Sequence, residues 1–340
     1  MFASVVVITK NNSKTIGETV TSLLNQTYPS NMYEIVVVDG HSNDGTDEIV
    51  TQFTKGNNNV RLLYENRGTM GYARNIGVEQ SRGDVILFID GDAQAPKDWI
   101  ENMVGALEGN NLTVVGGLDI LVSSSESTQI MDSWRRLKKI YGVKAIPCIQ
   151  TVNFAVKRNA LLSCGGFDPS LSHWDEAEVM AKIYSKMKDA RILYDPDIIV
   201  YHRHSKTSSL VRRIKGVFKR SVNGTAVLMR RHMIRVAIAS PTSTIGVSFL
   251  LIPLCISGMI AVALSIATGL LLRNLIISLI VYLVALGTYI FFMFRRTRSY
   301  SLRVPLILTI DLVVRLTGTF VGLVKWLFSF SKSSTTADKK

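Results

Sequence analysis

The chain has 340 residues, enough for about two domains, and its charge is unevenly distributed. Residues 1–200 contain 19 Lys and Arg against 24 Asp and Glu, whereas residues 201–340 contain 20 Lys and Arg against 2 acidic residues. The basic half is also the apolar half, so its charge indicates contact with a membrane surface and excludes nucleic acid as the expected partner. Three widely spaced cysteines (Cys148, Cys164 and Cys255) predict neither a disulfide framework nor a zinc site.

Strand-like and helix-like segments alternate along the first 200 residues. Apolar runs predict strands at 3–8, 34–38, 60–64, 85–89, 114–121, 153–156 and 192–202. Helical patterns cover 13–24, 44–55, 71–81, 98–108, 130–141 and 175–187. Ser13 is the expected N-cap of the first helix, and a loop is expected at 123–127. This alternation predicts an α/β fold with a Rossmann-like, mostly parallel sheet. The chain enters its first strand almost at once, so we expect no signal peptide and a cytoplasmic amino-terminal half.

Two aspartates follow the strand expected at 85–89, in the order Asp90-Gly91-Asp92. The carboxyl end of a buried strand is where open α/β sheets bind ligands. Gly91 allows the backbone or a ligand to approach closely. Two carboxylates at this spacing suit Mg²⁺ or Mn²⁺ carrying a diphosphate, although a solvated turn can have the same pattern.

Further polar residues occur where other expected elements begin or end. Asp39 ends the second strand, where a carboxylate can accept hydrogen bonds from a nucleobase or a ribose, and Asp44 can cap the helix that follows. Arg74, in Ala73-Arg74-Asn75, supplies a cation suited to a diphosphate. The turn Gly165-Gly166-Phe167-Asp168 precedes a helix that starts with Asp175, Glu176 and Glu178, where acids can also serve only the helix dipole. His202 ends the last strand of this half.

In this order and spacing, the motifs resemble those of a family 2 glycosyltransferase with the GT-A fold, over about residues 3–204. The resemblance implies a nucleotide-sugar donor and a divalent cation, Mg or Mn. It implies that the donor is bound by Thr9, Asn11, Asp39, Arg74 and Asp90. It also implies that the metal is bound by Asp92, His202 and Asp90.

Two departures from the family pattern bear on the chemistry. In relatives, the second acid of a Glu-Asp pair is the general base, whereas this chain has Asp175-Glu176. Glu176 occupies the position of the base, but the swapped order leaves open which acid acts. The first loop has Ile8 and Lys10 where proline and an aromatic residue are common. A hydroxyl acceptor needs a base, whereas a lipid phosphate is already ionised and needs none.

Membrane contact is predicted after a transferase domain at 1–204. Segment 205–240 interleaves basic and apolar residues, as in an amphipathic helix lying on anionic lipid. Its residues Arg212, Arg213 and Lys215, together with Trp174, are the expected acceptor or lipid contacts.

Segment 241–330 is expected to be a small all-α transmembrane region. Uncharged runs at 245–272 and 275–294 predict a hairpin of two spanning helices, and the basic residues that follow place the next loop in the cytoplasm. Segment 304–328 is long enough to span, but its Asp311 and Arg315 also allow a re-entrant or interfacial helix. Residues 331–340 are expected to be a disordered tail.

The leading hypothesis is therefore an inverting, non-processive glycosyltransferase acting on a lipid-linked acceptor. It would be a multi-pass protein of the cell membrane with its catalytic domain in the cytoplasm. A processive polysaccharide synthase is less favoured, because 205–240 contains no tryptophan and thus no Gln-x-x-Arg-Trp signature. A non-catalytic membrane scaffold is disfavoured by the acids retained at 39, 90, 92 and 176. The motifs specify neither the sugar nor the oligomeric state.

Overall fold

The computed structural model describes residues 1–109, 112–121, 149–171, 175–187 and 189–203, with the isolated positions 215, 216, 218, 222, 318 and 321. The chain divides into two compact units, Met1–Thr207 and Ser208–Lys340. Apart from those isolated positions, the segments predicted at 123–141, 205–240, 241–330 and 331–340 lie outside the described residues. Within the described part, no helix combines the length and the apolar character needed to cross a bilayer.

The first unit is built on one eight-stranded sheet with the order β3-β2-β1-β4-β7-β6-β8-β5. The strands are β1 (Ala3–Thr9), β2 (Tyr33–Asp39), β3 (Val60–Tyr64), β4 (Val85–Asp90), β5 (Ala93–Gln94), β6 (Val114–Leu121), β7 (Phe154–Lys157) and β8 (Ile192–His202). The strands predicted from apolar runs are thus confirmed. The two-residue β5 was missed, because so short a segment has no periodicity to detect.

The sheet is mixed, but most of its strands run in the same direction, as predicted. Strands β3, β2, β1 and β4 are parallel neighbours, and β6 pairs in parallel with β8. In contrast, β7 is antiparallel to both β4 and β6, and β5 is antiparallel to β8. Because β7 is antiparallel to both of its neighbours, β4 and β6 run in the same direction, and β8 runs with β6. The carboxyl ends of β1, β2, β4 and β8 therefore share one edge of the sheet.

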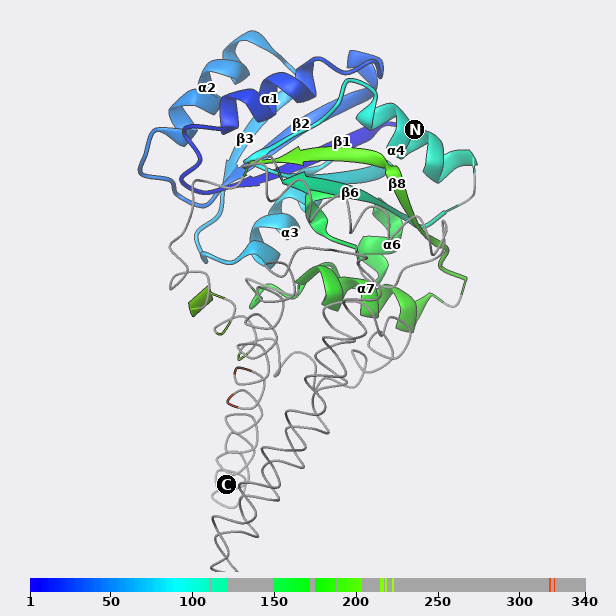
Figure 1. Cartoon of the computed structure of the whole chain (residues 1–340). Coiled ribbons are helices and arrows are strands. Elements are labelled where there is room, and N and C mark those ends of the chain that lie inside the picture. The colour runs from blue at the N-terminus through cyan, green and yellow to red at the C-terminus, as the bar shows by residue number, and fades with distance from the viewer. Residues whose placement is uncertain are drawn as a thin grey trace, which may run out of the picture. The chain divides into compact units, whose positions relative to one another are not determined.

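Helices cover both faces of this sheet (Figure 1). They are α1 (Ile16–Leu24), α2 (Thr46–Gly56), α3 (Met70–Gln80), α4 (Trp99–Gly109), α6 (Arg158–Ser163) and α7 (Asp175–Lys186), with 3₁₀ turns at η1 (Ser30–Met32) and η2 (Thr151–Asn153). Alternate strand residues point to opposite faces. One core joins Val5 and Val7 of β1 to α1, α2 and α4, and the other joins Val6 to α3, α6 and α7. Burial on both faces explains the unbroken apolar runs.

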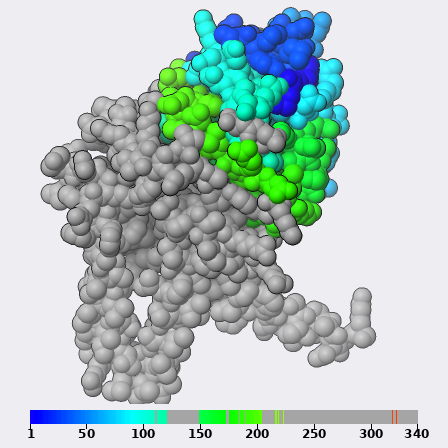
Figure 2. Space-filling model, turned by 90° about the vertical axis from the view of Figure 1, so that its right-hand side faces the viewer, coloured from blue at the N-terminus to red at the C-terminus, as the bar shows by residue number. Residues whose placement is uncertain are grey.

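The described residues before position 122 and those after position 148 contribute to one surface of the unit. Figure 2 shows a face on which the residues before position 122 (blue to cyan) adjoin those of 149–203 (green). The core agrees with this, because Phe154 of β7 packs with Phe88 of β4 at 5.7 Å between ring centroids. The carboxyl-terminal part of the unit thus completes the same sheet.

The first helix begins later than predicted. It starts at Ile16 with Thr15 as its N-cap residue, and Ser13 instead donates its backbone N–H to Asp44 Oδ2 at 3.0 Å. The Thr15 hydroxyl makes no cap bond but lies 3.1 Å from the carbonyl oxygen of Gly91. Tertiary contacts therefore displaced the local capping signal.

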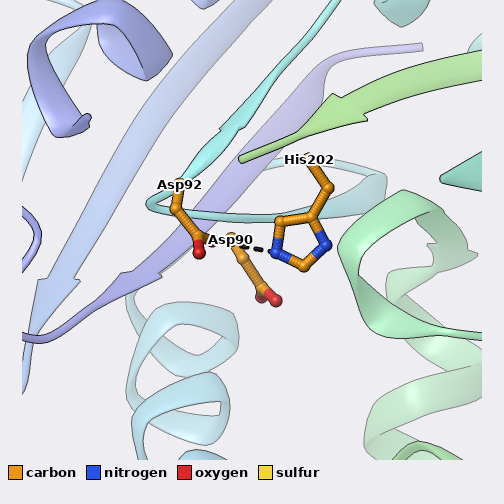
Figure 3. A group of neighbouring side chains, drawn as sticks. All are labelled: Asp90, Asp92 and His202. Carbon is orange, nitrogen blue, oxygen red and sulfur yellow. Dashed lines mark hydrogen bonds and ion pairs between the residues drawn. The ribbon is translucent and has the colours of Figure 1, made fainter. Parts of the chain in front are cut away.

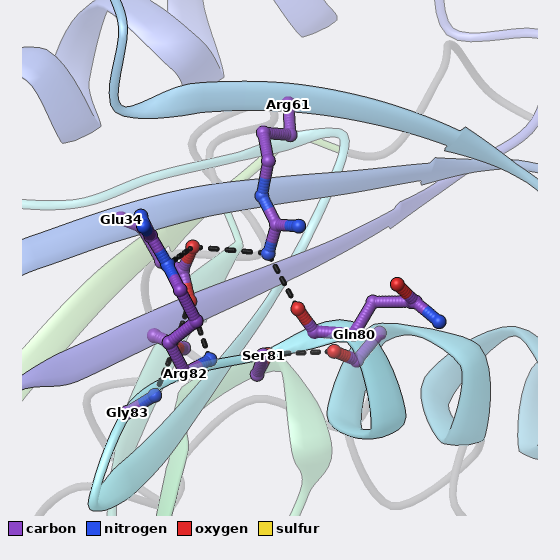
Figure 4. A network of polar contacts seen from close by, with 8 residues as sticks. Glu34, Arg61, Gln80, Ser81, Arg82 and Gly83 are labelled. Carbon is purple, nitrogen blue, oxygen red and sulfur yellow. Dashed lines mark hydrogen bonds and ion pairs between the residues drawn. The ribbon is translucent and has the colours of Figure 1, made fainter.

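A buried carboxylate joins several strands at the edge formed by their amino ends, opposite the edge where the carboxyl ends meet (Figure 4). Glu34 of β2 is fully buried and accepts hydrogen bonds from Ser4 Oγ (2.7 Å), Arg61 Nη2 (3.0 Å), and the backbone N and Nε of Arg82 (2.6 and 3.0 Å). Burial alone would raise the pKa of Glu34, but the hydrogen bonds and the two arginine charges outweigh it and lower the pKa. Glu34 thus supports the amino ends of β1, β2 and β3 as an anion.

We expect Glu34→Gln to lower the free energy of unfolding by about 2 kcal/mol at pH 7, because hydrogen bonds to a charged group are lost. The folded-state pKa of Glu34 lies below its unfolded value, so its contribution exists above the unfolded pKa and disappears as the pH falls through the folded pKa. Urea denaturation at pH 7 and pH 3 should therefore show the difference shrinking in acid. Glu108→Gln is the control, because its ion pair with the Met1 amino group is solvent-exposed and should contribute little. An equal difference at both pH values would contradict the prediction.

Candidate metal and donor site

The edge formed by the carboxyl ends of the strands gathers residues that are far apart in sequence. In the register of the sheet, Thr9 of β1 lies opposite Asp39 of β2, and Ile8 lies opposite Asp90 of β4. At the other end of the site, His202 of β8 lies opposite Ala93 of β5. The predicted donor and metal residues therefore meet at one place because the strands end there together.

Three side chains converge at the centre of this edge (Figure 3). Asp90, Asp92 and His202 each offer one ligand atom, and these atoms all lie within 4.8 Å of one another. His202 Nε2 lies 3.1 Å from Asp92 Oδ1. The pairing of β5 with β8 brings them together, and the Arg203 backbone N–H donates to the Asp92 carbonyl oxygen at 2.7 Å. Two carboxylates and an imidazole form a donor set that fits Mn²⁺ or Mg²⁺.

The charges in this group favour an added cation. Burial raises the pKa of Asp90, and the nearby Asp92 and Asp175 raise it further against the opposing effects of Arg74 and His202. Burial alone would lower the pKa of His202, but the hydrogen bond with Asp92 and the surrounding carboxylates outweigh it and raise the pKa. The group thus holds more negative charge than its own side chains neutralise. A divalent cation placed among these carboxylates would favour their ionised forms.

Arg74 connects the group formed by Asp90, Asp92 and His202 to the acidic start of α7. Its side chain is 1% exposed, its Nη1 forms an ion pair with Asp175, and its Nη2 lies 3.7 Å from Asp90 Oδ1. The guanidinium also lies over the ring of Phe167, 5.7 Å from the centroid. Arg74 was predicted to bind the donor, and in the structure it contacts these two carboxylates.

The two acids at the start of α7 differ in their surroundings. Asp175 is buried and paired with Arg74, whereas Glu176 is half-buried. Burial and the neighbouring Asp175 raise the pKa of Glu176 to about 8, against the opposing charge of Arg74. Glu178 is buried and pairs with Lys182 at 3.1 Å. Glu176 thus combines partial exposure with a pKa near neutrality, which suits proton transfer.

The glycine-rich turn before α7 is fastened to α3. Asn75 Nδ2 donates to the Phe167 carbonyl oxygen at 2.8 Å, and the Phe167 N–H donates to Asn75 Oδ1 at 2.9 Å. Gly166 has a φ of 65°, and a Cβ there would lie 2.6 Å from Asn75 Oδ1. Thr69 Oγ1 donates to the Pro169 carbonyl oxygen at 2.7 Å. The Ala73-Arg74-Asn75 motif and the turn at 165–168 therefore form one structure.

The loops after β1 and β2 are held together by hydrogen bonds. Asp39 is buried and accepts from the backbone N and Oγ of Ser42, at 2.7 and 2.5 Å. Ser42 Oγ in turn accepts from the Asn11 N–H at 2.8 Å, and Asn11 Oδ1 accepts from the Asn43 N–H at 3.0 Å. Asn11 and His41 have φ values of 55° and 54°, a strained conformation that often marks functional sites. Asp39 therefore orders the second loop, and Asp44 accepts from the Thr46 N–H at the start of α2.

Some residues near the site were missed by the sequence analysis. His41 and the 49% exposed Tyr64 stack at 5.6 Å between centroids, at the ends of neighbouring strands. Thr15 and Thr19 of α1 both contact the Gly91 carbonyl oxygen. Their spacing of four residues indicates that both hydroxyls lie on one side of the helix, but the apolar residues between and after them dominate the pattern.

The structure does not test the four residues that were predicted to contact the acceptor or lipid. Trp174, Arg212 and Arg213 lie outside the described residues, and Lys215 is an isolated, exposed position in the second unit. Their roles stay predictions.

Known structures share the fold of the chain. A mannosyltransferase from Pyrobaculum calidifontis, PcManGT, solved with GDP-Man and Mn²⁺, superposes with a TM-score of 0.61 at 20% sequence identity. The superposition covers 96% of this chain and 87% of that one. At this identity the likeness defines the fold, which is a mixed, curled α/β sheet of the GT-A type.

Sequence relatives identify the family. Residues 4–166 match the description "Glycosyl transferase family 2". Glycosyltransferase AglE of Haloferax volcanii is 32% identical over 181 residues, which span 51% of this chain and 60% of that protein. The glucosyl-dolichyl phosphate glucuronosyltransferase of the same organism is 30% identical over 233 residues, which span 60% of this chain and 69% of that protein. The chain therefore belongs to glycosyl transferase family 2.

Proposed function

We propose that this protein is an inverting, non-processive glycosyltransferase that moves a sugar from a nucleotide-sugar to a lipid-linked acceptor, with Mn²⁺ or Mg²⁺ as cofactor. The observation that carries the proposal is the convergence of Asp90, Asp92 and His202 within reach of the acids that start α7. The related protein named for glucosyl-dolichyl phosphate supports a lipid-linked acceptor. The structure solved with GDP-Man and Mn²⁺ supports a nucleotide-sugar donor and a cation.

In this proposal, the chain's own residues divide the work of an inverting displacement. Asp92, His202 and Asp90 would hold the cation, which supplies positive charge to the leaving diphosphate. Arg74 holds Asp90 and Asp175 in fixed positions. Glu176 accepts the proton of the acceptor hydroxyl as its oxygen attacks the anomeric carbon from the face opposite the diphosphate. Asp175 is unsuited to that role, because its carboxylate is buried and is occupied by the ion pair with Arg74.

The placement in the membrane is part of the same proposal. We place the protein in the cell membrane, with the domain at 1–204 in the cytoplasm and the segment 205–240 at the lipid surface. The basic residues Arg212, Arg213 and Lys215 would then lie where the head group of a lipid acceptor is exposed.

The first prediction from the proposed function concerns the cation. We expect Asp92→Ala to reduce transfer at least 100-fold while the protein stays folded, because the diphosphate loses its counter-charge. Chelation should abolish wild-type transfer, and Mn²⁺ or Mg²⁺ should restore it. Mn²⁺ should also bind more weakly in acid, because a proton competes for His202, whose pKa is raised.

Asp98→Ala is the matched control for this experiment, because Asp98 is an exposed aspartate six positions further along the chain. Full transfer by the wild type in excess chelator would refute the cation requirement.

The second prediction concerns the base. With a hydroxyl acceptor, we expect Glu176→Gln to lower kcat by about 10²–10⁴-fold and to leave donor binding intact. Wild-type kcat/KM should rise with pH and level off above about 8, because Glu176 must lose its proton to act. This pH-dependent rise should be absent from the variant.

A lipid-phosphate acceptor gives a different result in the same assay. Glu176→Gln should then cost little, and the triple change Arg212→Ala, Arg213→Ala, Lys215→Ala should raise the acceptor KM much more than the donor KM. Near-normal kinetics in both variants would leave the proposed chemistry without support.

The third prediction concerns the loop after β2. We expect Asp39→Ala to raise the donor KM about 10-fold, as the loss of a buried charged hydrogen bond implies. Ser42→Ala separates two origins of this effect, because Ser42 is the partner that Asp39 holds. An equal rise in both variants assigns the effect to loop order, and a rise in Asp39→Ala alone assigns it to contact with the donor. Unchanged donor binding in both, measured by calorimetry, would exclude the loop from the donor site.

A further inference from the structure

One face of α1 carries polar side chains that contact the segment 91–95, which follows Asp90. Thr15, Glu18, Thr19 and Ser22 are spaced by three and four residues, so they line one side of the helix. Thr15 Oγ1 and Thr19 Oγ1 each donate to the Gly91 carbonyl oxygen at 3.1 Å. Ser22 Oγ accepts from the Ala95 N–H, also at 3.1 Å. The helix thus holds the loop at both ends of the segment 91–95.

The Gly91 peptide is confined from two directions. Its carbonyl oxygen accepts both threonine hydroxyls, and Thr19 is completely buried. On its other side, a Cβ at position 91 would lie only 2.6 Å from Thr9 Oγ1. Because this peptide lies directly between Asp90 and Asp92, its orientation determines where both carboxylates point.

Glu18 links the same helix to residues that lie close to Asp92 and His202 in the chain. Its carboxylate accepts from Gln94 Nε2 and pairs with Arg203 Nη1 at 2.5 Å. Gln94 lies two residues after Asp92, and Arg203 directly follows His202. A shift of α1 would therefore move both ends of the His202–Asp92 contact.

We propose that Thr15, the N-cap residue of α1, and Glu18 and Thr19 within α1 are positioning residues that set the affinity of the Asp90, Asp92 and His202 group for a divalent cation. The inference rests on the proposed function, because the cation is the one that the transfer requires. Groups that orient metal ligands typically change metal affinity 10- to 100-fold when removed.

The test uses the full chain and Mn²⁺ alone, titrated and followed by electron paramagnetic resonance. We expect the double variant Thr15→Val, Thr19→Val to raise the Mn²⁺ dissociation constant at least 10-fold, because valine keeps the shape of threonine but removes the hydroxyl. Thr15→Ser, Thr19→Ser keeps both hydroxyls and should bind Mn²⁺ within about 2-fold of the wild type. Thr21→Val, on the exposed face of the same helix, is the matched control and should have no effect.

A purely structural role makes a different prediction. It would lower the melting temperature of the cation-free double variant and leave Mn²⁺ affinity unchanged, which would overturn the proposal. Glu18→Gln covers the case in which the double variant fails to fold, because Glu18 is exposed and its loss leaves the core intact. That variant should bind Mn²⁺ at least 3-fold more weakly, and unchanged binding would overturn the proposal. Absence of Mn²⁺ binding by the wild type would instead overturn the proposed function itself.

Discussion

The candidate site depends on one buried positive charge. Arg74 is almost completely buried, and burying a guanidinium is costly unless it is paired. Its partners are Asp175 and Asp90, which come from opposite sides of the site. The neighbouring Asn75 fixes the turn that leads to α7. Arg74 and Asn75 of α3 therefore set the distance between the Asp90, Asp92 and His202 group and the acids of α7. The carboxylates at this edge stay close together because the Arg74 guanidinium lies between them.

Local sequence patterns were sufficient to predict the regular strands and helices. The run at 85–89 predicted a strand buried on both faces, and the rule that ligands bind at strand carboxyl ends placed Asp90 and Asp92 correctly at that edge. Glu176 was marked as the base by resemblance alone. The structure adds a physical reason, a pKa raised by burial and by Asp175, and its role stays a prediction.

Contacts between distant segments were not predictable from local patterns. Arg74 and Asp175 are 101 positions apart, and no periodicity links them. The two-residue β5, which brings His202 to Asp92, exists only because β8 pairs with it. Ser13 was the expected N-cap of the first helix, yet the N-cap residue is Thr15, whose hydroxyl makes no cap bond and contacts Gly91 instead. Each of these features is decided by packing, which competes with local preference and prevails.

The Glu34 network has a consequence for altering this enzyme. It lies at the amino ends of β1, β2 and β3, at the opposite edge of the sheet from the strained Asn11 and His41. The Glu34 carboxylate is completely buried, whereas the Arg61 and Arg82 side chains are 34% and 65% exposed, so only the carboxylate needs a well-packed apolar replacement. That edge is therefore where directed evolution could make the domain more heat-resistant while leaving its chemistry untouched. The Glu34 network and the candidate site lie at opposite edges of the sheet, so stability and activity can be selected independently.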